Sequence, residues 1–348
     1  MKKLLKLTTG FVALLCASQL TCRAWDYEGH RLVNQIALAS LPANFPAFAL
    51  SPAAKERVAF LAGEPDRWRN ATDPTLAHVN GPDHYIDLEQ LDDYGIDPKT
   101  LTEFRYDFAA QLALARAAHL DKFPEIDPDK NRDHTRQLVG FLPWAIVENF
   151  DKLKSEFSYL KAFEAGGGTP EEIANAQANI LYTMGVMGHY VGDAAQPLHT
   201  TKHHHGWVGG NPNGYTTGTR FHSWIDGGYF NKIGIPRVGE LKDMIHPAQL
   251  VSLAYPAKDT FSSVMDYIFA QQKLVEPLYQ IEKAGKLSGD GDLGHEGKSF
   301  LIGQMIKGGQ MLGDLWLTAW QQAPQDTYLT SQLARRKLAG TNAGSKPN

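Results

Sequence analysis

Side chains of the kind that bind metal ions recur in this sequence at helical spacing. His189 and Asp193 are four positions apart, so on one helix both project from the same face about one turn apart. His222 and Asp226 repeat this spacing, and His199 lies between the two pairs. One such pair is commonly an ordinary hydrogen-bonded pair. Two pairs at usable spacing favour a metal site with imidazole and carboxylate ligands.

A further ligand arises if the first 24 residues are removed during export. This leader has three lysines, then a short apolar stretch, then Cys22 and Ala24 as small residues at the −3 and −1 positions. The pattern is typical of a signal peptide, and its apolar part is too short to span a bilayer. Cleavage would leave Trp25 with a free α-amine five positions before His30, where amine and imidazole can chelate a metal. We therefore expect an exported protein, periplasmic or secreted.

The composition limits the possible classes of function. Cys16 and Cys22 both lie in the leader, so the mature chain has no cysteine and cannot be stabilised by disulfides. A lipidated cysteine is a weaker alternative, because Leu15 and Thr21 are poor residues before such a site. The remaining chain has 30 basic and 38 acidic residues, a net charge of −8. This balance argues against a simple basic groove for nucleic acid, so a polyanionic substrate would need another source of positive charge.

Helical signals dominate the chain. The clearest start is Thr169-Pro170-Glu171-Glu172, with Thr as N-cap, Pro at the first helical position and Glu at the third. This helix should continue to about Asp193, since Pro197 excludes further extension. Apolar stripes predict other helices over residues 32–37, 102–120 and 301–319.

Strand signals are limited to short runs at Tyr85-Ile86 and in the polar loop 206–221. The 324 residues after the leader are enough for a full core, and 43% hydrophobic residues in the chain fit a globular protein. We expect an all-α fold, one mostly helical domain over residues 25–324, followed by a disordered tail over 325–348.

The spacing of these residues resembles one known family. The matching segments are Trp25-x-x-x-Gly29-His30, Gly188-His189-x-x-Gly192-Asp193-x-x-Gln196-Pro197-Leu198-His199 and His222-x-x-x-Asp226. They closely resemble the zinc-dependent single-strand nucleases of the nuclease S-one/P-one type, which share a trinuclear zinc fold with bacterial zinc phospholipases C. The resemblance runs from Trp25 to Asp226, with a looser helical match to about Trp320.

The resemblance implies three zinc ions held by nine residues. One ion would be held by Asp66, His84, His189 and Asp193; a second by the amine and carbonyl of Trp25, His30 and Asp193; and a third, more open ion by His199, His222 and Asp226.

Two of these ligands have rivals nearby. Asp66 lies in a Glu-Pro-Asp context that departs from the family's usual Trp-Ala-Asp, and Asp73 and Asp83 are alternatives. His84 is followed by an aromatic residue, an Ile and an Asp, as expected, and His78 is its close rival. The resemblance also gives Asp66 the role of orienting the nucleophile.

Three zinc ions would carry six positive charges against three ligand carboxylates, and this would attract phosphate to an acidic protein. A bridged zinc pair can activate water near neutral pH, while the third ion stabilises the leaving oxygen. The expected reaction is hydrolysis of single-stranded DNA and RNA to 5′-phosphate products, with removal of 3′-phosphates from nucleotides as a further activity. Single-stranded nucleic acid or a nucleotide is the expected partner, with no protein partner and no transmembrane segment.

Substrate choice should depend on loops near these ligands. Gly209, Gly210 and Asn211 match the family's base-binding Gly-Gly-Asn element, although such residues also form ordinary turns. Trp207 and Tyr215 could stack on a base or simply pack in the protein. Arg67 and Arg69 could contact phosphate, although exposed charges on a helix are the default. Phe141, Trp144 and Tyr182 are expected in the core.

The triplet His203-His204-His205 is the largest departure from the family pattern. We favour a solvated, metal-binding tract over a lid on the third zinc. Two competing functions remain: a zinc phospholipase C acting on lipid headgroups and a zinc-sequestering binding protein. The Gly-Gly-Asn element, the compact Asp193-to-His199 spacing and the absence of an evident lipid-binding domain favour a nuclease. The open third site disfavours sequestration.

Overall fold

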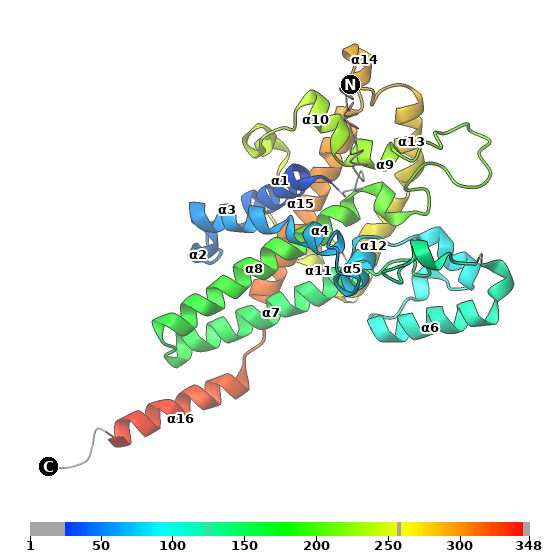
Figure 1. Ribbon diagram of the computed structural model, residues 1–348. Helices are drawn as coiled ribbons and strands as arrows, with labels where there is room; N and C mark the ends of the chain where they lie inside the picture. The colour runs from blue at the N-terminus through cyan, green and yellow to red at the C-terminus, as the bar shows by residue number, and fades with distance from the viewer. Residues whose placement is uncertain (1–24, 124, 256–258, 344–348) are drawn as a thin grey trace, which may run out of the picture.

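The computed structural model describes residues 25–123, 125–255 and 259–343, and over these residues it is helical without a β-strand (Figure 1). The expected all-α class is therefore confirmed, and the short strand signals near Tyr85 and in the loop 206–221 are wrong. Ile86 N instead donates a single backbone hydrogen bond to His199 O.

The long helices are α1 (Tyr27–Ser40), α3 (Pro52–Leu61), α6 (Arg105–Ala118), α7 (Leu142–Gly166), α8 (Pro170–Ala195), α12 (Thr260–Gln272), α13 (Val275–Lys283), α15 (Lys298–Gln321) and α16 (Thr327–Ala343). Shorter helices are α2 (Ala47–Leu50), α4 (Glu64–Arg69), α5 (Pro74–Asn80), α9 (Phe221–Ser223), α10 (Tyr229–Ile233), α11 (Val251–Ala254) and α14 (Gly291–His295). Three single turns matter for the site: η1 (Gly81–His84), η6 (Pro197–Thr200) and the π-helix η7 (Trp224–Gly228).

Helix α8 begins at the capping box that the sequence predicts. The Thr169 hydroxyl accepts a hydrogen bond from Glu172 N at 3.2 Å, and the Glu172 carboxylate accepts one from Thr169 N at 2.7 Å. Gly167, with φ of 82°, ends α7 just before this start. The two helices therefore reverse direction over three residues and pack side by side as a long hairpin (Figure 1).

Helix α1 packs closely against both α8 and α15. A Cβ atom at Gly188 of α8 would overlap Asn34 Oδ1 of α1, and one at Gly309 of α15 would overlap Ile36. The Asn34 amide donates to Val58 O at 2.9 Å and to Gly185 O at 3.1 Å, which joins α1, α3 and α8. This close approach places the start of α1 beside the end of α8, where the predicted ligands lie.

The tail differs from its expected disorder, because residues 327–343 form helix α16 against α7. Leu333 is buried and packs where a side chain at Gly166 would otherwise lie. The Arg336 guanidinium donates to Gly167 O at 3.0 Å and to the Glu172 carboxylate at 2.8 and 3.0 Å. The burial of Leu333 and these hydrogen bonds therefore hold in a helix a segment whose polar composition predicts disorder.

The expected core residues are confirmed with one exception. Phe141 and Trp144 are buried, whereas Tyr182 is 43% exposed. The buried positions in this part of α8 follow one helix face through Ala176, Ile180 and Thr183, and Tyr182 lies off that face.

We predict that Gly188→Ala lowers the free energy of unfolding by about 1–3 kcal/mol, because the added methyl group must displace Asn34. The matched control is Gly303→Ala in α15, where a Cβ has no neighbour within 4 Å. The control should be neutral or stabilising by up to about 1 kcal/mol. Urea unfolding measures both, and equal effects would contradict this account of the packing.

Candidate metal centre

Eight predicted ligand side chains converge on one end of α8. His30 comes from α1, Asp66 from α4, His84 from η1, His189 and Asp193 from α8, His199 from η6, and His222 and Asp226 from α9 and η7. All eight are buried. Among the described residues, three groups could hold a metal ion: His30, Asp66 and His189; His84, His189 and Asp193; and His199, His222 and Asp226.

The inner groups are arranged around Asp193. One oxygen, Oδ2, lies 2.9 Å from His84 Nδ1 and 3.4 Å from His189 Nε2. The other, Oδ1, lies 3.4 Å from His30 Nε2 and accepts no hydrogen bond within the described protein. Each oxygen therefore faces a different set of nitrogens, the arrangement of a bridging carboxylate. Asp66 Oδ1 completes the inner side at 3.9 Å from His189 Nε2.

Backbone carbonyls fix which nitrogens can bind a metal. His189 Nδ1 lies 2.7 Å from Ala62 O and His199 Nδ1 lies 2.6 Å from His84 O. Each Nδ1 must carry a hydrogen to donate there, so each neutral ring presents the lone pair of Nε2 to its group. Outer hydrogen bonds of this kind commonly orient metal-binding histidines.

In the outer group, His222 and Asp226 lie close to His199, and an outer hydrogen bond again orients one of the candidate ligands. His222 Nε2 lies 2.9 Å from His199 Nε2 and 3.1 Å from Asp226 Oδ2. Gln196 Nε2 donates to the other oxygen, Asp226 Oδ1, at 2.7 Å and so orients the carboxylate. The i,i+4 pair lies where α9 passes into the π-helix η7, rather than on the regular α-helix its spacing suggests. Such bulges are frequent at functional sites.

Burial shifts the pKa values of the candidate ligands toward their uncharged forms. Removal from water lowers the pKa of His84, His189 and His199 well below the usual value, so these rings are neutral and able to bind metal. The same effect raises the pKa of Asp193 and Asp226 well above the usual value. Ionised carboxylates at these positions need a compensating positive charge, which a divalent cation supplies.

Trp25 is buried beside both parts of the centre. Its indole Nε1 donates to Gly192 O at 2.9 Å, next to Asp193, and the following amide, Asp26 N, donates to Asp226 O at 3.0 Å. The predicted signal peptide, residues 1–24, lies outside the described residues. The free amine of Trp25 thus stays a prediction, for a residue held next to the ligands it would join.

Two glycines of α8 have a role that the sequence did not predict. A Cβ at Gly192 would lie 2.9 Å from His30 Nδ1, so the missing side chain lets His30 approach the helix. The His30 ring stacks on His189 with centroids 3.8 Å apart. The signal in the sequence was the spacing of Gly188 and Gly192, which places both on the face toward α1, whereas Gly185 faces Leu61 of α3.

The structure separates the predicted ligands from their rivals. Asp66 and His84 lie in the inner groups. Asp73 instead caps α5, Asp83 pairs with Arg105, and the exposed His78 lies 2.7 Å from Asp133 O through its Nδ1.

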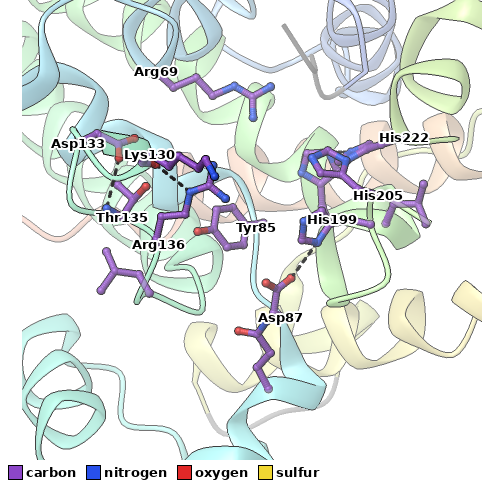
Figure 2. A pocket seen from close by; sticks show the side chains of 14 residues that line it. Arg69, Tyr85, Asp87, Lys130, Asp133, Thr135, Arg136, His199, His205 and His222 are labelled. Atoms are coloured by element: carbon purple, nitrogen blue, oxygen red, sulfur yellow. Dashed lines mark hydrogen bonds and ion pairs between the residues drawn. The ribbon is translucent and has the colours of Figure 1, made fainter. Parts of the chain in front are cut away.

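The outer group opens into a cavity of about 490 Å³ (Figure 2). His199 and His222 form part of its wall. Its cationic side chains are Arg69, Lys130 and Arg136, of which sequence analysis identified only Arg69. Tyr85, Asp87, Gln90, Asp133, Thr135, Leu138, Leu198, His204 and His205 complete the lining. The new residues come from segments far from the ligand pattern, which is why spacing could not find them.

The predicted base-binding loop does not line this cavity. Asn211 uses its amide to close its own turn, accepting from Tyr215 N and donating to Tyr215 O, both at 2.8 Å. Gly209 and Gly210 are exposed beside it. Tyr215 is buried and donates to Glu276, and Trp207 stacks on His203. This arrangement supports the turn and packing alternatives for the loop.

The histidine triplet is only partly solvated, because His205 alone is exposed. His203 is buried beneath Trp207, and His204 and His205 line the cavity next to His222. His204 Nδ1 lies 3.4 Å from Asp87 Oδ1. Burial alone would lower the pKa of His204, but the contact with Asp87 raises it. The favoured expectation was therefore wrong for His203 and His204, because the loop folds back onto the site.

Comparisons of the chain with models of protein families, with curated proteins and with solved structures find no match. Within the described residues, none of the helices combines the length and the apolar character needed to cross a bilayer.

We predict that His222→Ala removes the ion of the outer group, whereas Asp193→Asn removes the ions of the inner groups, because Asp193 faces three of their histidines. The control is His78→Ala, an exposed histidine outside the centre. Elemental analysis of dialysed protein measures the bound metal. Equal metal content in all three variants would show that these groups do not bind it.

We predict opposite effects of Asp226→Asn with and without metal. Because burial raises the pKa of Asp226, the folded metal-free protein loses stability as pH rises from about 3.8 toward that raised pKa. Asparagine removes this cost and still accepts from Gln196. Metal-free Asp226→Asn should therefore be more stable than wild type at pH 7, by about 1 kcal/mol or more, and equal to it at pH 3. With zinc bound, Asp226→Asn should be less stable than wild type, because it lacks the charged ligand. Thermal unfolding in chelator and in zinc tests both signs.

Proposed function

We propose that the chain is an exported zinc-dependent phosphodiesterase that hydrolyses single-stranded DNA and RNA to 5′-phosphate products, with 3′-nucleotidase activity at the same site. The observation that carries the proposal is the position of the outer His/Asp group in the wall of a cavity that also holds three cationic side chains. The resemblance to single-strand nucleases gives the reason for preferring nucleic acid among phosphodiesters.

Charge accounts for how an acidic protein could attract this substrate. The cavity has Arg69, Lys130 and Arg136 against Asp87 and Asp133. Three bound zinc ions would exceed the charge of the ligand carboxylates Asp66, Asp193 and Asp226. The net charge of −8 is thus no obstacle, because a phosphate responds most strongly to the charges nearest to it.

Bound zinc would supply the electrophilic charge that activates water and stabilises phosphate oxygens. The residues of the chain would place the reacting groups. Asp66 Oδ1 lies 2.7 Å from Arg69 Nη2, so the carboxylate is held in one orientation and can accept a hydrogen bond from the attacking water. The Arg69 guanidinium reaches the cavity, where it can donate to a phosphate oxygen.

Tyr85 gives the cavity an aromatic side chain next to His204, with ring centroids 6.5 Å apart. It lies between the cationic side chains and the histidines in Figure 2. A base that is not paired could stack on this ring, whereas a paired base could not. We therefore assign base contact to Tyr85 instead of the Gly209-Gly210-Asn211 loop.

We predict that protein beginning at Trp25 and loaded with zinc cleaves single-stranded DNA and RNA and leaves 5′-phosphate ends. Asp66→Asn should lower kcat by about 10²–10⁴-fold, the usual range for a group that assists proton transfer. Phosphatidylcholine vesicles form the third substrate of the assay. Turnover of lipid without turnover of nucleic acid would contradict the nuclease proposal and favour a phospholipase C.

A second variant carries one extra residue before Trp25. The α-amine then no longer belongs to Trp25, so this variant should lose one zinc ion and most activity, while circular dichroism shows an intact fold. Full zinc content and normal rates would show that the amine is not a ligand.

A further inference from the structure

A second cavity continues from the one beside the outer group. It measures about 470 Å³ and shares Arg69, Lys130 and Asp133 with the first. Beyond these residues it is lined by Asn70, Ala71, Thr72, Pro74, Ala77, Asp129 and Arg132. The two cavities therefore adjoin, and together, from His199 and His222 past Arg69 to Arg132, they are called the groove below.

The far wall of this groove is an ordered loop over residues 127–137. Asn131 Oδ1 accepts from Arg136 N at 3.0 Å, and Asn131 Nδ2 donates to Gln137 Oε1 at 3.2 Å. His134 has φ of 55°, and it is the one non-glycine residue with positive φ in the described part of the chain. An unfavourable conformation of this kind is kept only where the surroundings hold it.

Two contacts tie the loop to the rest of the protein. His78 Nδ1 lies 2.7 Å from Asp133 O, and Tyr94 donates to Gln137 O at 3.1 Å. The loop thus presents Lys130, Arg132 and Arg136 from a fixed backbone, and little ordering remains to be done when a ligand binds.

The charges of the groove favour a chain of phosphates. It contains Arg69, Lys130, Arg132 and Arg136, four cationic side chains, against Asp87, Asp129 and Asp133, three acidic ones. Asp87 lies beside His204. Arg136 and Lys130 lie across the first cavity from the histidines (Figure 2). Spaced cationic side chains along a groove suit a backbone with repeated negative charge better than a single phosphate.

We propose that the second cavity binds the sugar-phosphate backbone of a single-stranded polynucleotide beyond the nucleotides at the cleaved bond, with Arg132 as its own cationic contact. The inference rests on the proposed function, and it makes the chain an enzyme that prefers polymers to dinucleotides. Asn70 and Thr72 supply neutral hydrogen-bonding groups on the same wall, as expected for contacts that do not depend on base identity.

The test compares Arg132→Gln with wild type on a 12-nucleotide strand and on a dinucleotide. The ratio of kcat/KM for the 12-mer to that for the dinucleotide should fall about three- to tenfold, because one charged phosphate contact is lost. Arg335→Gln is the matched control, an exposed arginine on α16. Asp129→Asn removes a repelling charge from the same cavity and should raise the ratio.

A binding measurement separates this inference from the proposed function. Binding of a fluorescent phosphorothioate 12-mer, followed by anisotropy over a range of salt concentrations, should give a logarithmic slope that is smaller by about 0.7 in Arg132→Gln. An unchanged slope and an unchanged ratio would overturn the polymer groove. If wild type cleaves no nucleic acid but the slope still falls, the groove stands and the nuclease proposal fails.

Discussion

The buried carboxylate of Asp193 contacts four histidine rings, and the rest of the centre is arranged around it. Its oxygens lie 2.9 Å from His84, 3.4 Å from His189, 3.4 Å from His30 and 3.8 Å from His199. A carboxylate in this position loses its hydration, and the neutral imidazoles of His84, His189 and His199 beside it cannot neutralise it. A divalent cation would satisfy both the carboxylate and the nitrogen lone pairs that face it. Metal binding would therefore stabilise this end of the helix bundle.

Close packing of α1, α3 and α8 positions the side chains of this centre. Asn34 joins α1, α3 and α8 through two carbonyl groups, and glycines on α8 let α1 approach until His30 stacks on His189. The carbonyl groups of Ala62 and His84 fix the orientations of the His189 and His199 rings, respectively. His30, His189 and His199 are thus positioned by packing or by backbone carbonyl groups, so these three rings would need little rearrangement to take up metal.

Around this rigid centre, the surfaces that would meet a substrate come from loops. The cations Lys130, Arg132 and Arg136 belong to a loop far from the ligands in sequence, and His204 and His205 fold over the outer group from the other side. An acidic chain can thereby concentrate positive charge in one groove. Overall charge governs solubility and long-range attraction, whereas the local arrangement governs what binds.

The sequence by itself determined the helical class, the start and end of α8, and the pairs His189–Asp193 and His222–Asp226, because these depend on local rules: capping, helical periodicity and i,i+4 spacing. It left Asp66 and His84 open against Asp73, Asp83 and His78, and it misjudged the tail and the histidine triplet. Only the tertiary structure decided these points. Which aspartate reaches His189, whether Leu333 finds a surface on α7, and where His204 folds all depend on contacts between segments distant in the chain. No local pattern records such contacts, because their energy comes from the partner that folding brings near.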